Sequence, residues 1–568
     1  MRKLIVALLV LTALGWVRSA SAQPRFATSG TEFWISFPAN EGGELPTETQ
    51  NAITLELTSN ATAHVTVEVT ALGYFKTAVV QPHGATTINL PAGNDSLQTV
   101  EIDLAGVLYH DRAIHVVADS AITVFALTHK LYSSEAFLAY PVAAFGKTFR
   151  TACFPTSMAP ASDPQPGEFL VLASEDQTTV TITPSCKTLD SRDSGVQFQK
   201  LLSRGDIYMV QSALTLNADL TGSLVTADKP ITVLSGHKRT EMPLRYQNSS
   251  GTTSRNILLE QLLPVELWDS SAAVVPFAGE QLSSVARIIS GSDGNRITIT
   301  SWDNIQPHDT TLASGEFYEV PSMLESYLVS ATGPIEVMEY LHSSLHNPGQ
   351  SGTPHSDPAM VLSPSLRHMD TTIVVDALSD LTLFPDQFVS IIESEDDPAL
   401  SLDGRTTSVD GTRLPIGTSG LTYATARLTP GIHTIHSSKP FAVMTFGMGV
   451  NDAYAYSGGL MGSAPTKGSS SVSSNIVEPA LAPFPNPVDP NVSNEISVPV
   501  STSEPAMHGT LWNAAGMLVG QELSSSLTHA GWVTFKLPPN LPLGVYAIQI
   551  QSSPTGSRAR YFFSVQAR

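Results

Sequence analysis

Charged residues are scarce in this chain of 568 residues. They make up only 14 % of the sequence, whereas soluble domains usually carry about 25 %. Lys and Arg total 30 against 51 Asp and Glu, which gives a formal net charge of -21. Nucleic-acid binding depends on basic side chains that neutralise phosphates, so this balance argues against a nucleic-acid partner. The apolar fraction of 42 % still predicts packed globular cores.

Cysteine is almost absent, since only Cys153 and Cys186 occur. Two cysteines cannot hold a chain of this length together, so the fold must depend on its hydrophobic cores. In an exported protein they could form one disulfide, and they could equally be two separate buried thiols. Their spacing fits no zinc motif, and the sequence predicts no metal site.

Long hydrophobic runs are missing except at the N-terminus. Met1, Arg2 and Lys3 precede an apolar stretch over residues 4–17, and Ala20-Ser21-Ala22 supplies small residues. This pattern predicts a signal peptide over residues 1–22, cleaved between Ala22 and Gln23. No later segment has about 18 continuous apolar residues, so we expect no transmembrane segment in the mature chain.

Motifs of catalysis are also lacking. The sequence contains no G-x-S-x-G elbow, no H-E-x-x-H helix, no Walker A loop and no G-x-G-x-x-G turn. We therefore expect no catalytic residue, no cofactor and no enzymatic activity. A glycan hydrolase that uses a pair of carboxylates remains the rival hypothesis, because sequence gives no distances between carboxylates.

A repeated motif is the main positive feature. Each copy is predicted to be a strand, a tight turn that usually holds Pro, and a second strand that ends in Val. The copies are IHVVADSAITV (114–124), SLVTADKPITV (223–233), YLVSATGPIEV (327–337) and TIHSSKPFAV (434–443). The positions equivalent to the Pro are Ala121, Pro230, Pro334 and Pro440, which are 109, 104 and 106 residues apart.

Other strands recur around this motif. A predicted hairpin with alternating apolar residues precedes each copy, as in LELTSNATAHVTVEV (55–69), and an opening strand such as GTEFWISFP (30–38) begins each unit. The sequence therefore predicts an all-β region over residues 23–461. Its four units of about 100–120 residues lie near 26–140, 141–263, 264–364 and 365–460. The units are expected to be sandwich-like, with a propeller-like ring as the alternative.

The last part of the chain has a different organisation. Residues 462–483 are rich in Ser and Pro and are predicted to be a linker. Residues 484–568 contain about six predicted strands, which suits a small β-sandwich.

The repeat region resembles the N-terminal domain family of the IgGFc-binding protein over about residues 28–459. The similar segments include GTEFWISFP, YSSEAFLAYP (132–141), FLVLASEDQTTVTITP (169–184), LLEQLLPVELW (258–268) and DAYAYSGG (452–459). The resemblance implies a secreted binding protein. An animal member is named for binding antibody Fc, so Fc and mucin-like proteins are the partners that it suggests.

Residues 484–568 resemble the C-terminal sorting domain of type IX secretion substrates of Bacteroidota. The matching residues are Pro485, Asn486, Pro487, Gly516, Gly544 and Tyr546. A lysine-rich last strand is common in that family, whereas this chain ends in Val-Gln-Ala-Arg. The resemblance implies export through the secretion machinery, followed by release or attachment at the outer-membrane surface.

The loops that follow the repeated motif are the candidate binding site. Equivalent loops should open on one face, and the second and third are longer than a simple connection needs. Histidine, basic and aromatic side chains gather in or near them and would supply contact area. The candidate ligand-binding residues are His129, Lys130, Tyr132, His237, Lys238, Arg239, Arg245, Tyr246, His342, His346, Tyr454 and Tyr456.

These observations together predict a secreted or surface-displayed bacterial adhesion protein. It would recognise an extracellular protein or glycan through the loops of a repeated β scaffold. The alternatives are a secreted glycan-acting hydrolase and a structural component of the cell envelope.

Overall fold

The computed structural model places most of the repeat region and the strands of the C-terminal region. The described residues are 27–40, 52–92, 99–130, 132–158, 163–244, 254–277, 284–301, 308–323, 325–344, 356–378, 383–395, 400–406, 413–417, 419–460, 495–499, 508–513, 518–523, 525–529, 532–538, 544–551 and 558–565. The signal peptide, the linker, Pro485–Pro487 and Gly516 lie outside them.

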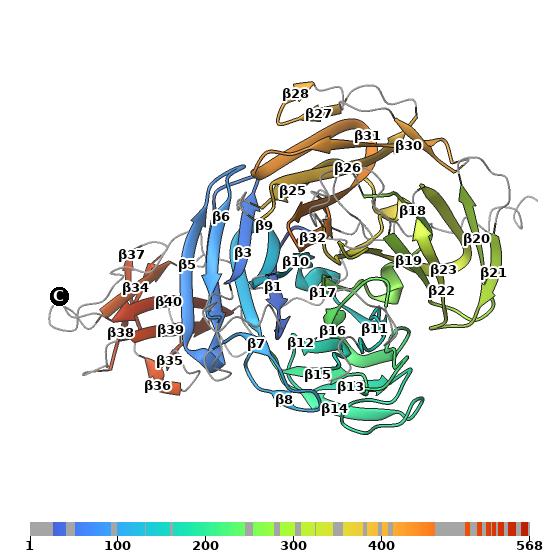
Figure 1. Ribbon diagram of the computed structural model, residues 1–568. Helices are drawn as coiled ribbons and strands as arrows, with labels where there is room; N and C mark the ends of the chain where they lie inside the picture. The colour runs from blue at the N-terminus through green and yellow to red at the C-terminus, as the bar shows by residue number, and fades with distance from the viewer. Residues whose placement is uncertain are drawn as a thin grey trace, which may run out of the picture.

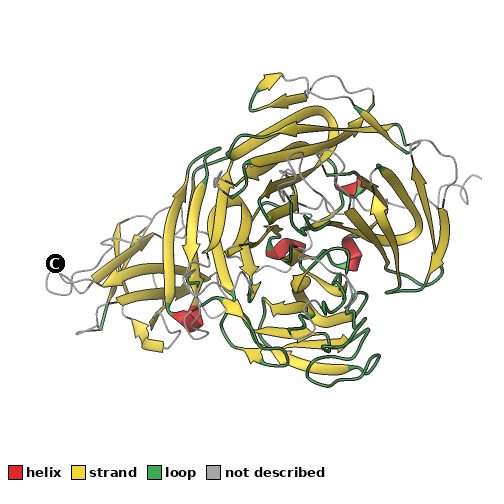
Figure 2. Cartoon of the chain, viewed as in Figure 1, coloured by secondary structure: helices red, strands yellow, loops and turns green. Residues whose placement is uncertain are grey.

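Strands form nearly all of the regular structure, so the all-β prediction is confirmed (Figure 2). The helical elements in the described ranges are four single 3₁₀ turns: η1 Thr70–Leu72, η2 Val142–Ala144, η3 Val265–Leu267 and η4 Leu366–His368. None of these turns is long enough to span a bilayer.

Four large antiparallel sheets follow one another along the chain, and we call them units 1 to 4. The sheet of unit 1 contains β1 (Gly30–Ile35), β3 (Ala52–Ser59), β4 (Ala63–Val69), β5 (Tyr74–Val80), β6 (Thr86–Leu90), β9 (Ile114–Lys130) and β10 (Ser133–Ala139). The sheet of unit 2 contains β11 (Gly146–Arg150), β12 (Gly167–Ala173), β13 (Thr178–Thr183), β14 (Phe198–Leu202), β15 (Ile207–Gln211), β16 (Leu224–Thr240) and β17 (Asn256–Gln261).

Units 3 and 4 repeat this pattern. Unit 3 contains β18 (Asp269–Val274), β19 (Ser284–Ser290), β20 (Asn295–Ser301), β21 (His308–Leu312), β22 (Phe317–Met323), β23 (Tyr327–Leu341) and β24 (Met360–Leu362). Unit 4 contains β25 (Asp370–Ala377), β26 (Asp386–Ser394), β27 (Leu400–Leu402), β28 (Arg405–Thr406), β29 (Leu414–Ile416), β30 (Leu421–Arg427), β31 (Gly431–Gly449), β32 (Asp452–Ser457) and β33 (Gly459–Leu460).

Two short strand pairings add to the four large sheets. β2 (Phe37–Pro38) pairs in parallel with β7 (Glu101–Ile102), within unit 1. β8 (Leu108–Tyr109) comes from the unit 1 segment but pairs with β15, so it is an edge strand of the unit 2 sheet. Neighbouring units therefore share backbone hydrogen bonds as well as side-chain contacts.

Each repeated motif is one long strand, and the predicted tight turn between two strands is wrong. In β9 the first half pairs with β4 and β1, and the second half pairs with β3 and β10. The pairing with β1 jumps from Val117 to Ile122, so the long strand changes partners there. Val116 and Val124, one from each half, lie in the same hydrophobic core. Each unit is thus two half-sheets that share one strand and pack together.

Proline fits this change of partners. In β16 the pairing with β11 jumps from Thr226 to Ile231, and Pro230 lies inside the jump. Pro334 and Pro440 lie in the same jumps of β23 and β31. Proline has no N–H to donate, so it is tolerated where the hydrogen-bond ladder is interrupted. The recurring proline therefore marks an equivalent position in these units, but that position is a bend within one strand and not a turn between two strands.

The four units close into a ring around an axis of inner strands (Figure 1). The inner strands are β10, β17, β24 and β32, one from each unit. β10 contacts both β17 and β32, and β24 contacts the same two strands, which closes the circle. The sequence left open whether the units are sandwich-like or form a propeller-like ring. The structure combines the two, because each unit has two packed half-sheets and the four units form a ring.

Polar side chains hold the inner strands together at the axis. Asn256 is fully buried, and its Nδ2 lies 2.7 Å from the Ser134 carbonyl, 2.7 Å from that of Pro358 and 3.1 Å from that of Ala453. One side chain of unit 2 therefore contacts units 1, 3 and 4. Because backbone groups buried at the axis need partners, this amide replaces hydrogen bonds that no neighbouring strand provides there.

Glu135 of β10 has a similar role. Its Oε2 accepts from the Met360 N–H of unit 3 at 2.8 Å, and its Oε1 accepts from the Ala455 N–H of unit 4 at 3.1 Å. Burial raises the pKa of this carboxyl well above its ordinary value.

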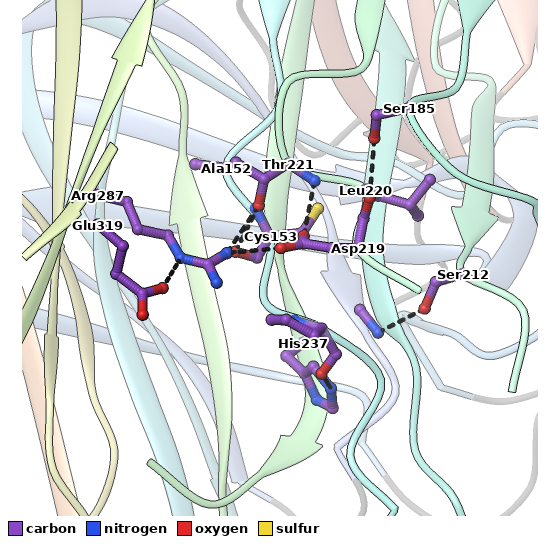
Figure 3. Close-up of polar contacts among 12 residues, drawn as sticks. Ala152, Cys153, Ser185, Ser212, Asp219, Leu220, Thr221, His237, Arg287 and Glu319 are labelled. Atoms are coloured by element: carbon purple, nitrogen blue, oxygen red, sulfur yellow. Dashed lines mark hydrogen bonds and ion pairs between the residues drawn. The ribbon is translucent and has the colours of Figure 1, made fainter. Parts of the chain in front are cut away.

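Arg287 of β19 joins units 2 and 3 (Figure 3). Its Nε donates to Glu319 at 2.9 Å, and its Nη1 donates to Asp219 at 2.9 Å and to the Cys153 carbonyl at 3.0 Å. The guanidinium also lies 4.4 Å from the centre of the Phe154 ring. A buried guanidinium with paired charges and an aromatic neighbour is satisfied on several sides at once.

The C-terminal region forms two antiparallel sheets. One contains β34 (Glu495–Pro499), β38 (Trp532–Lys536) and β37 (Ser525–His529), and the other contains β36 (Leu518–Leu523), β35 (His508–Asn513), β39 (Gly544–Gln551) and β40 (Arg558–Val565). Leu511 of the second sheet and Phe535 of the first are both buried. Gly544 begins β39, and Tyr546 lies on it.

Candidate functional site

Hairpin tips and loops gather at one end of the ring, which we call the loop face. The tips are the residues between each long strand and the inner strand that follows it. In unit 1 the tip includes Tyr132 and in unit 4 it includes Val450 and Asn451. Tyr132 and Asn451 have positive φ angles of 58° and 53°, as tight turns require. In units 2 and 3 the same connection spans residues 241–255 and 342–359, of which 245–253 and 345–355 lie outside the described residues.

Contacts between units confirm that these connections lie together. His129 Nδ1 of unit 1 is 3.7 Å from Asp452 Oδ2 of unit 4. Ser344 Oγ of unit 3 is 3.2 Å from Asn451 Oδ1 of unit 4, and the Ser343 N–H donates to the Met242 carbonyl of unit 2 at 2.8 Å. The four connections therefore open on one face, as the repeat pattern requires.

The exposed side chains of the loop face are few. Tyr132 is 43 % exposed and Val450 is 50 % exposed. Lys238 is half-buried, and its Nζ is 3.3 Å from Asp103 Oδ1. Lys130 Nζ donates to the Asn40 carbonyl, and Arg239 is half-buried. The described part of this face is thus mainly polar, with an aromatic and an aliphatic side chain exposed at two of its hairpin tips.

The candidate histidines are largely built into the protein. His237 is fully buried, its Nε2 donates to the Pro155 carbonyl at 3.1 Å, and its Nδ1 accepts from the Arg239 N–H at 3.0 Å. Burial lowers the pKa of His237 to about 3, so this imidazole is neutral. With both nitrogens in use it cannot ligate a metal or meet a ligand in this conformation. His342 is buried as well.

His129 is the least buried of the three described histidines, with its side chain 16 % exposed. Its Nδ1 lies 2.5 Å from Ser134 Oγ. This contact positions the imidazole beside the hairpin tip of unit 1.

Tyr454 and Tyr456 are also fully buried. The Tyr454 hydroxyl donates to Gln387 Oε1 at 2.7 Å, and the Tyr456 hydroxyl donates to the Asp376 carbonyl. Both rings belong to the core around β32 rather than to a contact surface, so Tyr132 is the exposed aromatic side chain among the candidates that the structure describes. Three further candidates, Arg245, Tyr246 and His346, lie outside the described residues.

The two cysteines are free thiols in the structure. Cys153 is buried, with its Sγ 3.1 Å from Ser235 Oγ, and Cys186 is partly buried. The disulfide is therefore not formed, and the alternative of two separate thiols describes the structure. Burial raises the pKa of both thiols, to about 12 for Cys186, which makes them poor nucleophiles at neutral pH.

Sequence reasoning missed two buried acids under the loop face. Asp357 precedes β24 and Asp452 begins β32, and both are almost completely buried. Burial raises the pKa of Asp452 to about 8 and that of Asp357 well above its ordinary value, and a negative charge on Asp452 raises the pKa of Asp357 further. Nothing in the sequence separates these aspartates from the solvated acids of ordinary turns.

The chemistry of these acids does not match hydrolysis. A glycosidase needs two carboxyl groups that flank a bound sugar in an open cleft. Asp357 and Asp452 are covered by protein in this structure. In the described ranges, no group of three His, Cys, Asp or Glu side chains could hold a metal ion.

The fold places the chain among all-β repeat proteins, with four sheet units around a common axis and connecting loops at one end. In the comparison with known families, the model of the IgGFc binding protein family matches residues 135–447. The chain therefore belongs to this family, and the membership suggests that it binds a protein ligand.

A curated relative shows the same relationship. The chain is 25 % identical over 413 residues to the human (Homo sapiens) IgGFc-binding protein. The match covers 70 % of this chain but only 7 % of that relative.

Two solved structures resemble the chain only weakly. A biofilm-associated protein BSP domain is 8 % identical with a TM-score of 0.13, over 97 % of this chain and 99 % of that one. A trypsin-activated alpha-2-macroglobulin from Escherichia coli is 10 % identical with a TM-score of 0.10, over 95 % of this chain and 49 % of that one. Neither similarity bears on the fold.

Proposed function

We propose that this chain is a secreted or surface-displayed bacterial adhesion protein that binds an extracellular protein through its loop face. The observation that carries the proposal is the convergence of the four connections, with Tyr132 and Val450 exposed at the hairpin tips. Exposed aromatic and apolar side chains inside a polar rim are typical of protein-binding surfaces. Membership of the IgGFc binding protein family supports a protein ligand.

The ends of the chain support the proposed location. Residues 1–22 have the pattern of a signal peptide, which would direct export of the chain. Residues 484–568 have the motifs of a type IX sorting domain, which would take it to the outer-membrane surface. Removal of residues 484–568 should leave the chain inside the producing cell, as cell fractionation would measure.

A binding array tests the proposal directly. The purified chain is applied to immobilised mucins, antibody Fc and glycans, and its affinity for each positive target is measured. Changing Tyr132→Ala together with Val450→Ser should weaken binding about tenfold, since a central aromatic side chain contributes about 1–2 kcal/mol to an interface.

Phe75→Ala is the matched control, because Phe75 is 41 % exposed but lies on β5, an outer strand of the unit 1 sheet. It should leave affinity unchanged. Equal losses for both variants would place the interface elsewhere, and a response confined to the glycans would replace the protein ligand by a carbohydrate.

A further inference from the structure

A cavity lies at the end of the ring axis opposite the loop face. The inner strands run from the loop face toward it: Asn256 begins β17 near the loops, whereas Leu263, just beyond β17, lines the cavity. All four units contribute to its wall, among them Tyr140 of unit 1 and Val443 of unit 4. The cavity volume is about 60 Å³, which is room for one small group or about four waters.

Glu336 of β23 lines this cavity with a buried carboxyl group. The residue is 3 % exposed, and neither carboxyl oxygen has a hydrogen-bond partner. Burial raises the pKa of this carboxyl well above its ordinary value. The nearby Leu263 amide and Trp268 indole act in the opposite direction, but neither is close enough and well enough aligned to form a hydrogen bond with it. A buried acid without partners is costly, so a ligand that supplies donors would be favoured here.

The other lining groups define which ligand fits. Asp269 adds a second acidic side chain, and serine hydroxyls add acceptors, whereas no Lys or Arg lines the cavity. Burial lowers the pKa of the lining residue His368 to about 4, so this imidazole carries no positive charge at neutral pH. Trp268 and Tyr140 provide aromatic walls, and aromatic faces attract cations. The cavity is therefore complementary to a small positive group.

We propose that this cavity binds a primary ammonium group carried on a short methylene chain, with Glu336 as its ion-pair partner and Trp268 and Tyr140 around the methylene groups. The chemistry is that of a lysine side chain of a partner protein or of a free alkylamine. An ammonium offers three donors to the two carboxyl oxygens, and its positive charge would favour release of the proton that burial keeps on Glu336, so that an ion pair forms. The inference goes beyond the proposed function, because it concerns the opposite face of the ring.

Calorimetric titration of the full chain with n-butylammonium tests the proposal, with n-butanol as the neutral probe of similar length. The amine should bind at least about tenfold more tightly than the alcohol, the factor expected for a charge-assisted hydrogen bond. Glu336→Gln should remove this preference. N-acetyl-lysine methylamide then distinguishes the two sources, since tighter binding than butylammonium points to a protein lysine and weaker binding to a free amine.

Glu339→Gln is the matched control. Glu339 lies on the same strand, is equally buried and accepts from Ser284 Oγ at 3.1 Å, but it does not line the cavity. It should bind butylammonium as the unchanged protein does. Ala442→Val narrows the wall without changing charge and should weaken amine binding, which provides a second test if Glu336→Gln does not fold.

Three results would overturn the proposal: no binding of the amine, equal affinity for amine and alcohol, or unchanged amine affinity after Glu336→Gln. None of them depends on the loop face. The amine titration can therefore fail while the array experiment succeeds, and the reverse also holds.

Discussion

Single polar side chains at the axis replace hydrogen bonds that neighbouring strands would make in a continuous sheet. Asn256 and Glu135 each contact two or three other units through backbone groups. A side chain that satisfies several buried backbone groups at once affects stability more than its size indicates, because each orphaned group costs about 1–3 kcal/mol.

Changing Asn256→Ala should therefore lower the free energy of unfolding by about 3 kcal/mol or more, since three buried carbonyls lose the two N–H groups that they share and the Ser134 N–H loses its acceptor. Urea denaturation followed by tryptophan fluorescence measures this loss. Asn89→Ala is the control, because Asn89 is exposed and the Tyr74 hydroxyl bonds to its backbone carbonyl, which the change keeps. Similar midpoints for the two variants would contradict the role given to Asn256.

At the scale of elements, the long bent strands and the junctions between units determine the architecture. The sequence predicted four repeated all-β units, because Ala121, Pro230, Pro334 and Pro440 occupy one equivalent position in each repeat. It misjudged the motif itself, since Asp-Lys-Pro fits a β-turn and a bend inside a strand equally well. Only the partner strands decide between the two, and β11 is about 80 residues from Pro230.

The site residues illustrate the same limit. Tyr454 and Tyr456 follow the last copy of the repeated motif and were therefore expected to add contact area at the loops, but both are buried. An inner strand is covered on both faces, by its own unit and by its neighbours, so the usual alternation of inside and outside fails there. His237 was assigned to a loop, whereas it lies inside β16. The hairpin tip at Tyr132 could be predicted, because it follows directly from the position of the repeat.

The junction of units 2 and 3 gives a prediction at this scale. Arg287→Lys keeps the charge but loses the planar fork that reaches Glu319 and Asp219 together. The expected loss is about 3 kcal/mol of stability, typical of disturbing a buried ion pair. Differential scanning calorimetry measures it. Arg296→Lys is the control, since Arg296 pairs with Asp309 in solvent and its change should leave Tm almost the same. A Tm unchanged in both variants would show that the junction does not depend on Arg287.

At the scale of the whole molecule, buried acids make stability depend on pH. Burial raises the pKa of Glu260, Glu339 and Asp452 to about 8 each and that of Asp376 to about 7. A carboxyl whose pKa is higher in the folded state holds its proton there after the unfolded chain has lost it. Its contribution is complete below the unfolded value and is lost as pH rises through the folded value.

Two buried histidines determine the lowest pH at which the effect of the buried acids on Tm can be measured separately. Burial lowers the pKa of His237 to about 3 and that of His368 to about 4, so their contribution is complete above the unfolded value of about 6.5 and is lost below it. Between pH 6.5 and 8.5 these two histidines contribute no further change, and Tm should fall by several degrees as the buried acids ionise with rising pH. Calorimetry at both pH values checks this, and Glu339→Gln should reduce the slope. A Tm that stays level or rises would show that these acids are ionised in the folded protein.

The closure of the ring has a consequence for how such chains can change over generations. An open array of repeats can gain or lose one copy at a time, since each repeat contacts only its neighbours. Here Asn256 contacts the other three units at once, and unit 4 packs against unit 1. A fifth copy would find no place at the axis, and the loss of one would leave carbonyls without donors. The copy number is therefore fixed at four, and new specificity must arise by lengthening and replacing loops.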